Sequence, residues 1–194
     1  TGRSEDKFGI PNSRITKLFE KYKNNKYLKI VGLSIHIGSQ IQNIRPFEIA
    51  FKKIKKQIES LRKLGFTISV LDLGGGIGIR YQENDRIINL KEYCLLIEKL
   101  FTNMKLEIII EPGRSLVGSS GILLSSVIRK KSGEQKDFII IDAGMNNLVR
   151  PAMYNARHEI FPVKRKSFKN KKYDFVGPIC ESADIFIKDN PSQN

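Results

Sequence analysis

The sequence predicts an α/β protein in its first part, up to about residue 118, followed by a part that is rich in strands. As far as Ile110, apolar segments of strand type alternate with amphipathic helical segments. Each of these strands is followed by polar residues or glycines. After Gly118 the helical spacing stops, and two apolar strands follow with a polar segment between them.

The first elements are a helix and a strand. Pro11-Asn-Ser13 is a helix-entry signal, and apolar residues follow at helical spacing as far as Tyr22. The range 27–37 reads as a strand with apolar odd positions from Val31 to Ile37. On its other face His36 follows Ser34, just before the break at Gly38.

Two further strand-helix repeats follow. Arg45 to Leu64 is the clearest helix, with Gly65 as its stop. A strand then runs into Leu71-Asp-Leu-Gly-Gly-Gly-Ile-Gly-Ile79, a second helix spans Leu90 to Phe101, and a third strand spans Leu106 to Ile110. This spacing favours parallel pairing through right-handed crossovers. Cys94 lies in an apolar run of the second helix, so we expect it to be a buried small hydrophobe.

Polar residues collect where these strands end, which is the edge at which α/β folds build sites. They are His36 and Ser39, then Asp72 with Gly74, Gly75 and Gly76, then Glu111 and Arg114. The glycine triplet can aim its N–H groups into one concavity and hold a phosphate. Taken alone, it is equally compatible with a flexible turn.

The other candidates also have plainer explanations. His36 alone reads more readily as a core histidine, and Glu111 as a surface carboxylate, although burial at a strand end would demand a partner for it. Arg114 is either that partner or a group that holds an anionic substrate. Cys180 lies between Pro178 and Glu181, outside any apolar run, which leaves inert packing and a functional thiol equally open.

In the second part, Ile122 to Ile128 and Phe138 to Ile141 read as an antiparallel hairpin joined by the polar segment 129–137. Residues 150–154 read as a short turn or helix, and 173–176 as a strand. The residues from Lys188 onward read as a polar tail.

The formal net charge of +14 raises the question of a nucleic-acid partner. The lysines are scattered, and the denser patch at 164–172 has no aromatic-basic motif beside it, which favours a solvated surface and no nucleic acid. No membrane span or signal peptide is evident. Two distant cysteines favour a reduced, cytoplasmic setting over a disulfide scaffold or a metal site.

One cofactor explains the strand-end residues together. Pyridoxal phosphate needs an anion cradle for its phosphate, a flat group against its ring and a charged partner at its pyridine nitrogen. The corresponding candidates are Gly74 to Gly76, His36 and Glu111.

Five motifs in order resemble the diaminopimelate decarboxylases, which belong to the alanine-racemase-like, fold type III class of pyridoxal-phosphate enzymes. They are His36-Ile-Gly-Ser-Gln40, Asp72-Leu-Gly-Gly-Gly-Ile-Gly78, Glu111-Pro-Gly-Arg114, the segment from Asp142 to Tyr154, and Cys180-Glu-Ser182. The resemblance implies a partial TIM-type (β/α)8 barrel over 1–118 and the start of a β-rich C-terminal domain over 119–194. The first three motifs are shared with ornithine and arginine decarboxylases, so the last two carry the substrate assignment.

The resemblance also implies a role for each residue. His36 stacks on the cofactor ring, and Glu111 keeps the pyridine nitrogen protonated. The phosphate is held by Ser39, by Gly74 to Gly76 and by the backbone of Glu111, Pro112, Gly113 and Arg114. The substrate, meso-diaminopimelate, is bound by Arg114, Arg150, Tyr154, Glu181 and Ser182. Cys180 reaches the site of the neighbouring subunit of a homodimer and returns a proton to Cα, which yields lysine.

The lysine that bonds the cofactor covalently in this family belongs to a segment upstream of these motifs, and no such segment is present here. We therefore expect the chain alone to be inactive and poorly folded. Two other readings stay open: a related decarboxylase acting on ornithine, arginine or carboxynorspermidine, and a degenerate copy that binds an intact decarboxylase.

Overall fold

The structure, a computed structural model, describes residues 7–82, 84–164 and 171–191. The chain divides into two compact units, Thr1–Gly121 and Ile122–Asn194. Each unit is described by itself. The assignment of residues 1–118 and 119–194 to two named domains stays a prediction.

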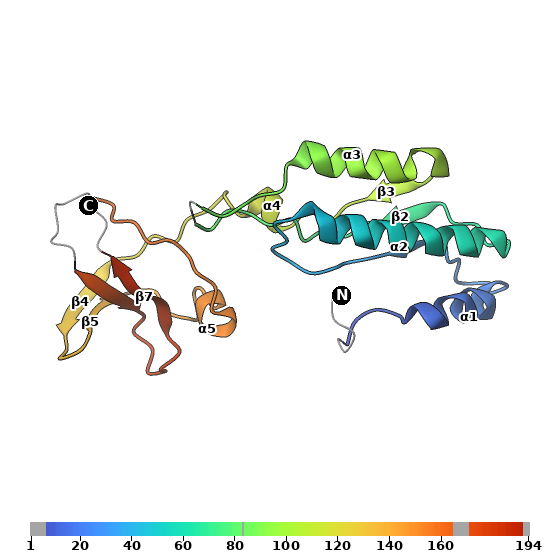
Figure 1. Ribbon diagram of the computed structural model, residues 1–194. Helices are drawn as coiled ribbons and strands as arrows, with labels where there is room; N and C mark the ends of the chain where they lie inside the picture. The colour runs from blue at the N-terminus through green and yellow to red at the C-terminus, as the bar shows by residue number, and fades with distance from the viewer. Residues whose placement is uncertain (1–6, 83, 165–170, 192–194) are drawn as a thin grey trace. The chain divides into compact units, whose positions relative to one another are not determined.

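The first unit contains a three-stranded parallel sheet with helices over it (Figure 1). Its elements are α1 (Asn12–Tyr22), β1 (Gly32–Ser34), α2 (Ile44–Lys63), β2 (Val70–Asp72), α3 (Leu90–Phe101), a 3-10 turn (Thr102–Met104), β3 (Glu107–Ile109) and α4 (Arg114–Val117). The strand order β1-β2-β3 confirms the predicted parallel pairing of these three strands.

The first strand is shorter than the sequence pattern predicts. The side chain of Asn25 accepts hydrogen bonds from the N–H groups of Tyr27 and Leu28, both at 2.9 Å, and this turn keeps the start of the segment out of the ladder. Pairing begins at Gly32, where an added Cβ would lie 2.2 Å from the carbonyl oxygen of Val70. Strand β1 therefore depends on a glycine for its close approach to β2.

The helices begin at side-chain caps. Asn43 precedes α2 and its side chain accepts a hydrogen bond from the N–H of Arg45 at 2.8 Å. Asn89 does the same for the N–H of Lys91 in α3, at 2.9 Å. Both caps satisfy backbone donors that the helix itself cannot.

The second unit contains a four-stranded sheet in the order β4-β5-β6-β7. Its elements are β4 (Val127–Ser132), β5 (Asp137–Ile141), α5 (Arg150–Tyr154), β6 (Lys172–Val176) and β7 (Ile185–Pro191). The pairs β4-β5 and β6-β7 are antiparallel, whereas β5 and β6 run parallel. The antiparallel hairpin is therefore confirmed.

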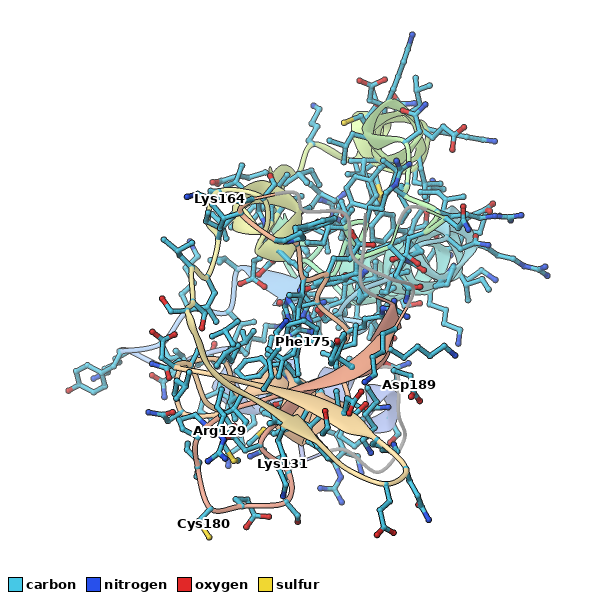
Figure 2. The ribbon with its side chains drawn as sticks, turned by 90° about the vertical axis from the view of Figure 1, so that its left-hand side faces the viewer. Arg129, Lys131, Lys164, Phe175, Cys180 and Asp189 are labelled. Atoms are coloured by element: carbon cyan, nitrogen blue, oxygen red, sulfur yellow. The ribbon has the colours of Figure 1, made fainter. Side chains whose placement is uncertain are left out.

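The bounds of that hairpin differ from the prediction. Strand β4 begins at Val127 and includes charged residues that we expected in the connecting loop. Figure 2 shows Arg129 and Lys131 along this strand, which lies at the edge of the sheet and is exposed throughout. Charged side chains on an exposed edge strand disfavour pairing with another chain, so polarity did not mark a loop here.

The prediction of a polar tail was wrong for residues 188–191, because β7 extends to Pro191. Residues 192–194 lie outside the described residues. Phe186 of this strand is buried in the core of the second unit with Ile139 and Ile141, and Ile187 is also buried. The basic patch at 164–172 lies largely outside the described residues.

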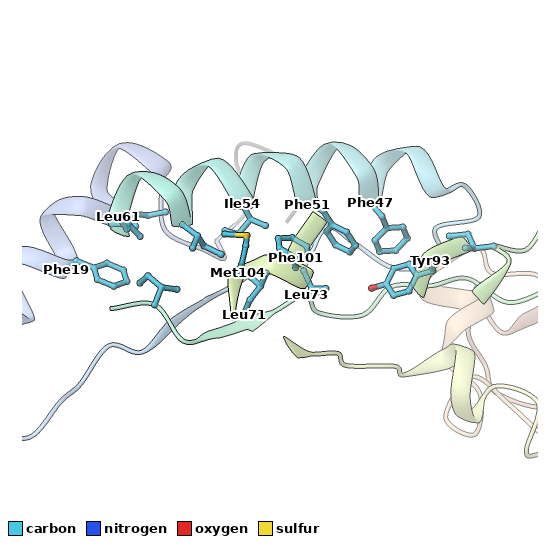
Figure 3. Packing of buried hydrophobic residues seen from close by; sticks show 14 residues of the cluster. Phe19, Phe47, Phe51, Ile54, Leu61, Leu71, Leu73, Tyr93, Phe101 and Met104 are labelled. Carbon is cyan, nitrogen blue, oxygen red and sulfur yellow. The ribbon is translucent and has the colours of Figure 1, made fainter. Parts of the chain in front are cut away.

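The core of the first unit lies between α2, α3 and the sheet. Figure 3 shows Phe47, Phe51 and Leu61 on the face of α2 that is turned toward the sheet, with Phe51 beside Phe101. The Tyr93 ring packs edge-on against Phe47, with centroids 5.2 Å apart.

The prediction for Cys94 was wrong, because this residue is exposed. In α3, Tyr93 and Phe101 are buried and Leu96, Ile97 and Leu100 pack partly against the core. These residues define one helical face, and Cys94 falls beside it.

No helix in the described parts of the chain is long and apolar enough to cross a membrane.

Alkaline pH tests the packing around Tyr93. Burial raises the pKa of Tyr93 to about 12, and the neighbouring Cys94 adds to the shift. Because the folded state favours the protonated phenol, Tyr93 contributes its full stabilisation below the unfolded pKa of about 10. That contribution is lost as the pH rises toward about 12. We expect urea unfolding of the complete polypeptide that carries this chain to show a smaller loss of stability between about pH 9 and about pH 11.5 for Tyr93→Phe than for the parent. Tyr27→Phe, at an exposed position, should lose as much as the parent.

Candidate functional site

The paired register brings three of the predicted residues to one edge of the first sheet. Ser34, Asp72 and Ile109 lie opposite one another in β1, β2 and β3. Backbone hydrogen bonds continue past the strand ends, from Leu73 N–H to the Ile109 carbonyl and from Glu111 N–H to the Gly74 carbonyl, both at 2.9 Å. Two residues beyond the last paired row come His36, Gly74 and Glu111, which therefore lie side by side at the carboxyl edge.

The glycine triplet is packed between the neighbouring backbones. An added Cβ would lie 2.2 Å from the Ile35 oxygen at Gly74, 2.0 Å from the Glu111 oxygen at Gly75 and 2.1 Å from the Gly38 oxygen at Gly76. Gly74 and Gly76 also have positive φ, at +66° and +101°. These glycines are required because three strand ends converge without room for a side chain.

From the sequence we expected the three N–H groups of the triplet to point into one concavity. In the structure they do not all do so. Gly74 donates to the Asp72 carboxylate at 2.8 Å, and Gly75 donates to Nδ1 of His36 at 3.4 Å. Among the described residues, Gly76 N–H has no acceptor. The Asp72 carboxylate takes the first amide in a short local turn, a competition that the glycine pattern does not reveal.

His36 and Glu111 are both exposed, so neither the core histidine nor the buried carboxylate is observed in this unit. The imidazole of His36 lies against the glycine bend, because its Nδ1 would be 3.2 Å from a Cβ at Gly74. An exposed flat ring, a backbone N–H and a carboxylate are thus available at one edge. Ser39, also exposed, follows on the same connection.

Sequence reasoning missed Gln40, which holds Arg114 in place. Its side-chain oxygen accepts hydrogen bonds from Arg114 Nη1 at 3.0 Å and from Ile79 N–H at 3.2 Å, and its amide donates to the Ile79 oxygen at 2.5 Å. The Arg114 guanidinium also lies 5.7 Å from the Tyr81 ring centroid. A glutamine is common in loops, so only its position after Gly38-Ser39 could have drawn attention to it.

Asp72 was noted in the sequence but given no role. Its second carboxylate oxygen accepts from the Ser34 hydroxyl at 3.1 Å, so Asp72 links β1 to the glycine bend of β2. The remaining residues of the third motif, Pro112 and Gly113, continue the same edge and are exposed.

The other predicted residues belong to the second unit. Arg150 and Tyr154 lie on α5, and Nη1 of Arg150 is 3.4 Å from Nε2 of His158, a residue that the motifs did not indicate. A pocket of about 380 Å³ lies between α5 and β7, and Ser182 and Ala183 line it together with Asn155.

Cys180 and Glu181 lie on the loop between β6 and β7. Figure 2 shows Cys180 at the tip of this loop, with its sulfur pointing outward, and the thiol is exposed. Glu181 accepts hydrogen bonds from Ala183 N–H at 3.2 Å and from the Ser182 hydroxyl at 3.0 Å. These two bonds lower the pKa of the Glu181 carboxyl, the Ala183 N–H contributing most.

No group of His, Cys, Asp and Glu side chains suited to a metal ion occurs among the described residues.

Comparison with known proteins shows the family to which the chain belongs. Residues 1–118 match the model of the pyridoxal-dependent decarboxylase, pyridoxal binding domain. The chain belongs to the pyridoxal-dependent decarboxylase family. The family's cofactor suits the observed edge, which offers the exposed His36 ring, the Gly76 N–H and the Glu111 carboxylate.

Two relatives of this chain carry the same name. Diaminopimelate decarboxylase of Aquifex aeolicus is 44% identical over 189 residues, 97% of this chain and 45% of that protein. The Helicobacter pylori enzyme is 40% identical over 97% of this chain and 47% of its own length. This chain thus spans about half the length of the curated relatives that it matches.

Solved structures of the same decarboxylases agree. The Helicobacter pylori diaminopimelate decarboxylase complexed with L-lysine has a TM-score of 0.92 and 39% identity, covering 100% of this chain and 48% of that one. The enzyme from M. jannaschii in complex with L-lysine has a TM-score of 0.91 at 34% identity, covering 98% of this chain and 45% of that one.

The glycine packing predicts the effect of one added methyl group. Gly75→Ala would press a Cβ against the Glu111 carbonyl, so we expect it to destabilise the first unit by about 3 kcal/mol and to weaken retention of pyridoxal phosphate. Gly121→Ala is the matched control, since a Cβ there meets nothing within 4 Å. Unfolding curves and cofactor retention after gel filtration of the complete polypeptide measure both effects. Equal behaviour of the two variants would contradict the packing argument.

Proposed function

We propose that this chain is part of a diaminopimelate decarboxylase, which removes one carboxylate from meso-2,6-diaminopimelate to give L-lysine and CO2, the last step of lysine biosynthesis. The observation that carries the proposal is the extent of the match. Similarity to diaminopimelate decarboxylases covers 97% of the chain, through the second unit that carries Arg150, Tyr154 and Cys180.

The fold proposal follows from the same comparison. The parallel strands β1 to β3, with α2 and α3 over them, suit a portion of a (β/α)8 barrel. The four-stranded sheet of the second unit suits the start of a β-rich domain. In a barrel, the edge that carries His36 and Glu111 is the one at which catalytic groups gather.

The first unit would hold the cofactor. His36 would lie against the ring, and Glu111 would pair with the protonated pyridine nitrogen. Ser39, the Gly74–Gly76 bend and the backbone from Glu111 to Arg114 would surround the phosphate, with Gly76 N–H as the available donor of the bend. Pyridoxal phosphate itself supplies an electron sink for the carbanion left when CO2 departs.

The charged residues would select the substrate. Arg114, Arg150 and Tyr154 would bind carboxylate, and Gln40 fixes Arg114 before substrate arrives. Glu181, an exposed carboxylate, would bind the distal ammonium group, with Ser182 beside it. Two opposite charges at the distal end of a zwitterion call for this combination of cations and a carboxylate.

Cys180 would return a proton to Cα in the neighbouring subunit of a homodimer. Its exposure at a loop tip supports a role outside its own unit. A thiol donor also explains why this position lies outside any apolar run.

Product analysis tests the assignment. The complete polypeptide that carries this chain, supplied with pyridoxal phosphate, should release equal amounts of lysine and CO2 from meso-diaminopimelate, with little turnover of ornithine or arginine. A preference for ornithine or arginine would assign the protein to a related decarboxylase. Retention of the cofactor with no turnover would indicate a non-catalytic copy.

Arg150 provides the substrate test. Removing a charged hydrogen-bond donor to a carboxylate costs about 1.5–3 kcal/mol, so we expect Arg150→Ala to lower kcat/KM for diaminopimelate by about 10- to 100-fold. Arg129→Ala, on the exposed edge strand β4, should leave it unchanged. A loss of similar size in both variants would count against a substrate contact.

Subunit mixing tests the shared site. His36→Ala and Cys180→Ala should each be nearly inactive alone. If the thiol acts across the interface, random mixing forms hybrid dimers with one intact site, and activity should return to about a quarter of the parent value. No recovery after verified subunit exchange would place the thiol in the site of its own subunit.

A further inference from the structure

We propose that Asp184 is a positioning residue, which holds the loop of Cys180, Glu181 and Ser182 in its working conformation by tying it to the loop at Met145. The importance of this loop for catalysis rests on the proposed function. The contacts that define the role lie wholly within the second unit.

Asp184 is a buried carboxylate, 3% exposed, in a loop that is otherwise largely open to solvent. One oxygen accepts the N–H of Met145 at 2.6 Å, and the other accepts the N–H of Ile179 at 2.8 Å. Met145 follows β5 and Ile179 follows β6, so a single side chain joins the connections of two strands. Burial of a carboxylate is costly, and these amide bonds offset that cost.

The backbone of Asp184 closes the same loop. Its carbonyl accepts from Gly177 N–H at 3.0 Å, and its N–H donates to the Glu181 carbonyl at 3.0 Å. Glu181 N–H in turn donates to the Ile179 carbonyl at 2.8 Å. Cys180 is therefore at the tip of a turn whose two ends are both fixed by Asp184.

Two glycines make room for this arrangement. A Cβ at Gly177 would lie 2.2 Å from a carboxylate oxygen of Asp184, and one at Gly144 would lie 2.8 Å from Cδ1 of Ile179. The carboxylate thus lies closely against the backbone at Gly177, and Gly144 leaves room for the Ile179 side chain. Small shifts of Asp184 must move the turn, because packed backbone leaves no free space to absorb them.

Glu181 and Asp184, two carboxylates of one segment, have different surroundings. Glu181 is exposed and available to a ligand, whereas Asp184 is enclosed and has both oxygens engaged by backbone amides. Asp184 does not touch reacting atoms. It acts through the placement of Cys180 and Glu181.

The test replaces one oxygen by a donor. In Asp184→Asn the volume is kept, but the amide NH2 must face either Met145 N–H or Ile179 N–H, which breaks one of the two bonds. We expect faster hydrogen exchange at one or both of these amides in the complete polypeptide. We also expect at least about a twofold change in the rate at which iodoacetamide alkylates Cys180 in a Cys94→Ser background.

Catalysis gives a second readout. With diaminopimelate, Asp184→Asn should lower kcat by about tenfold or more, because proton return by a displaced thiol is slowed, and should also raise KM, because Glu181 on the same turn binds the distal ammonium group. In a Cys180→Ser background the same substitution should lower kcat little further, since both changes act on proton return.

Asp174→Asn is the matched control. Asp174 is another buried carboxylate of the second unit, 4% exposed, and it accepts from Asp189 N–H at 2.7 Å. The Asp174→Asn variant should show the same hydrogen exchange at Met145 and Ile179, and the same alkylation rate of Cys180, as the parent.

Several results would overturn the inference. Unchanged exchange and alkylation in Asp184→Asn, equal effects of Asp174→Asn, or unfolding of the whole second unit by circular dichroism would each reduce Asp184 to a general structural residue. Failure of the proposed function is separate, because it would appear as absent lysine formation in the parent while exchange and alkylation still report on the loop.

Discussion

The parallel register of β1, β2 and β3 is the constraint on which the first unit depends. Hydrogen bonds that continue past the strand ends place His36, Gly74 and Glu111 in one row. The row forms only because Gly74 and Gly75 have no Cβ. A Cβ at either position would collide with the carbonyl oxygen of a neighbouring segment, Ile35 on one side and Glu111 on the other. The positions of these residues at the carboxyl edge are therefore a consequence of backbone pairing.

Local hydrogen bonds to carboxylates and amides then fix the groups that the register brings together. Asp72 accepts the first amide of the glycine bend, Gln40 holds Arg114, and Asp184 holds the Cys180 turn. In each case a short polar side chain near a loop takes a backbone or guanidinium donor. Such bonds limit the conformations of a loop, which a site needs before a ligand binds.

The long helices and the parallel sheet could be predicted because their signals are repeated along the sequence. The spacing of apolar residues in α2 and α3 gave both helices nearly to their ends. Cys94 shows the limit of that reasoning, since an apolar run does not say which of its members faces the core. The end of β4 was misplaced because charged residues occupy an exposed edge strand, and β7 was missed because polar and charged residues fill much of it.

The candidate site divides in the same way. His36, the glycines and Glu111 were found because their residue types are unusual at strand ends. Gln40 and Asp184 were given no role because their partners Arg114 and Met145 are distant in the sequence, and spacing gives no access to such pairs.

The tight packing at Gly75 also bears on how such a protein can diverge. An added side chain at this bend would collide with the main chain of the next strand, so the bend tolerates almost no substitution. Exposed positions, such as those along β4, can change at little cost, so substitutions should accumulate there sooner than at the bend.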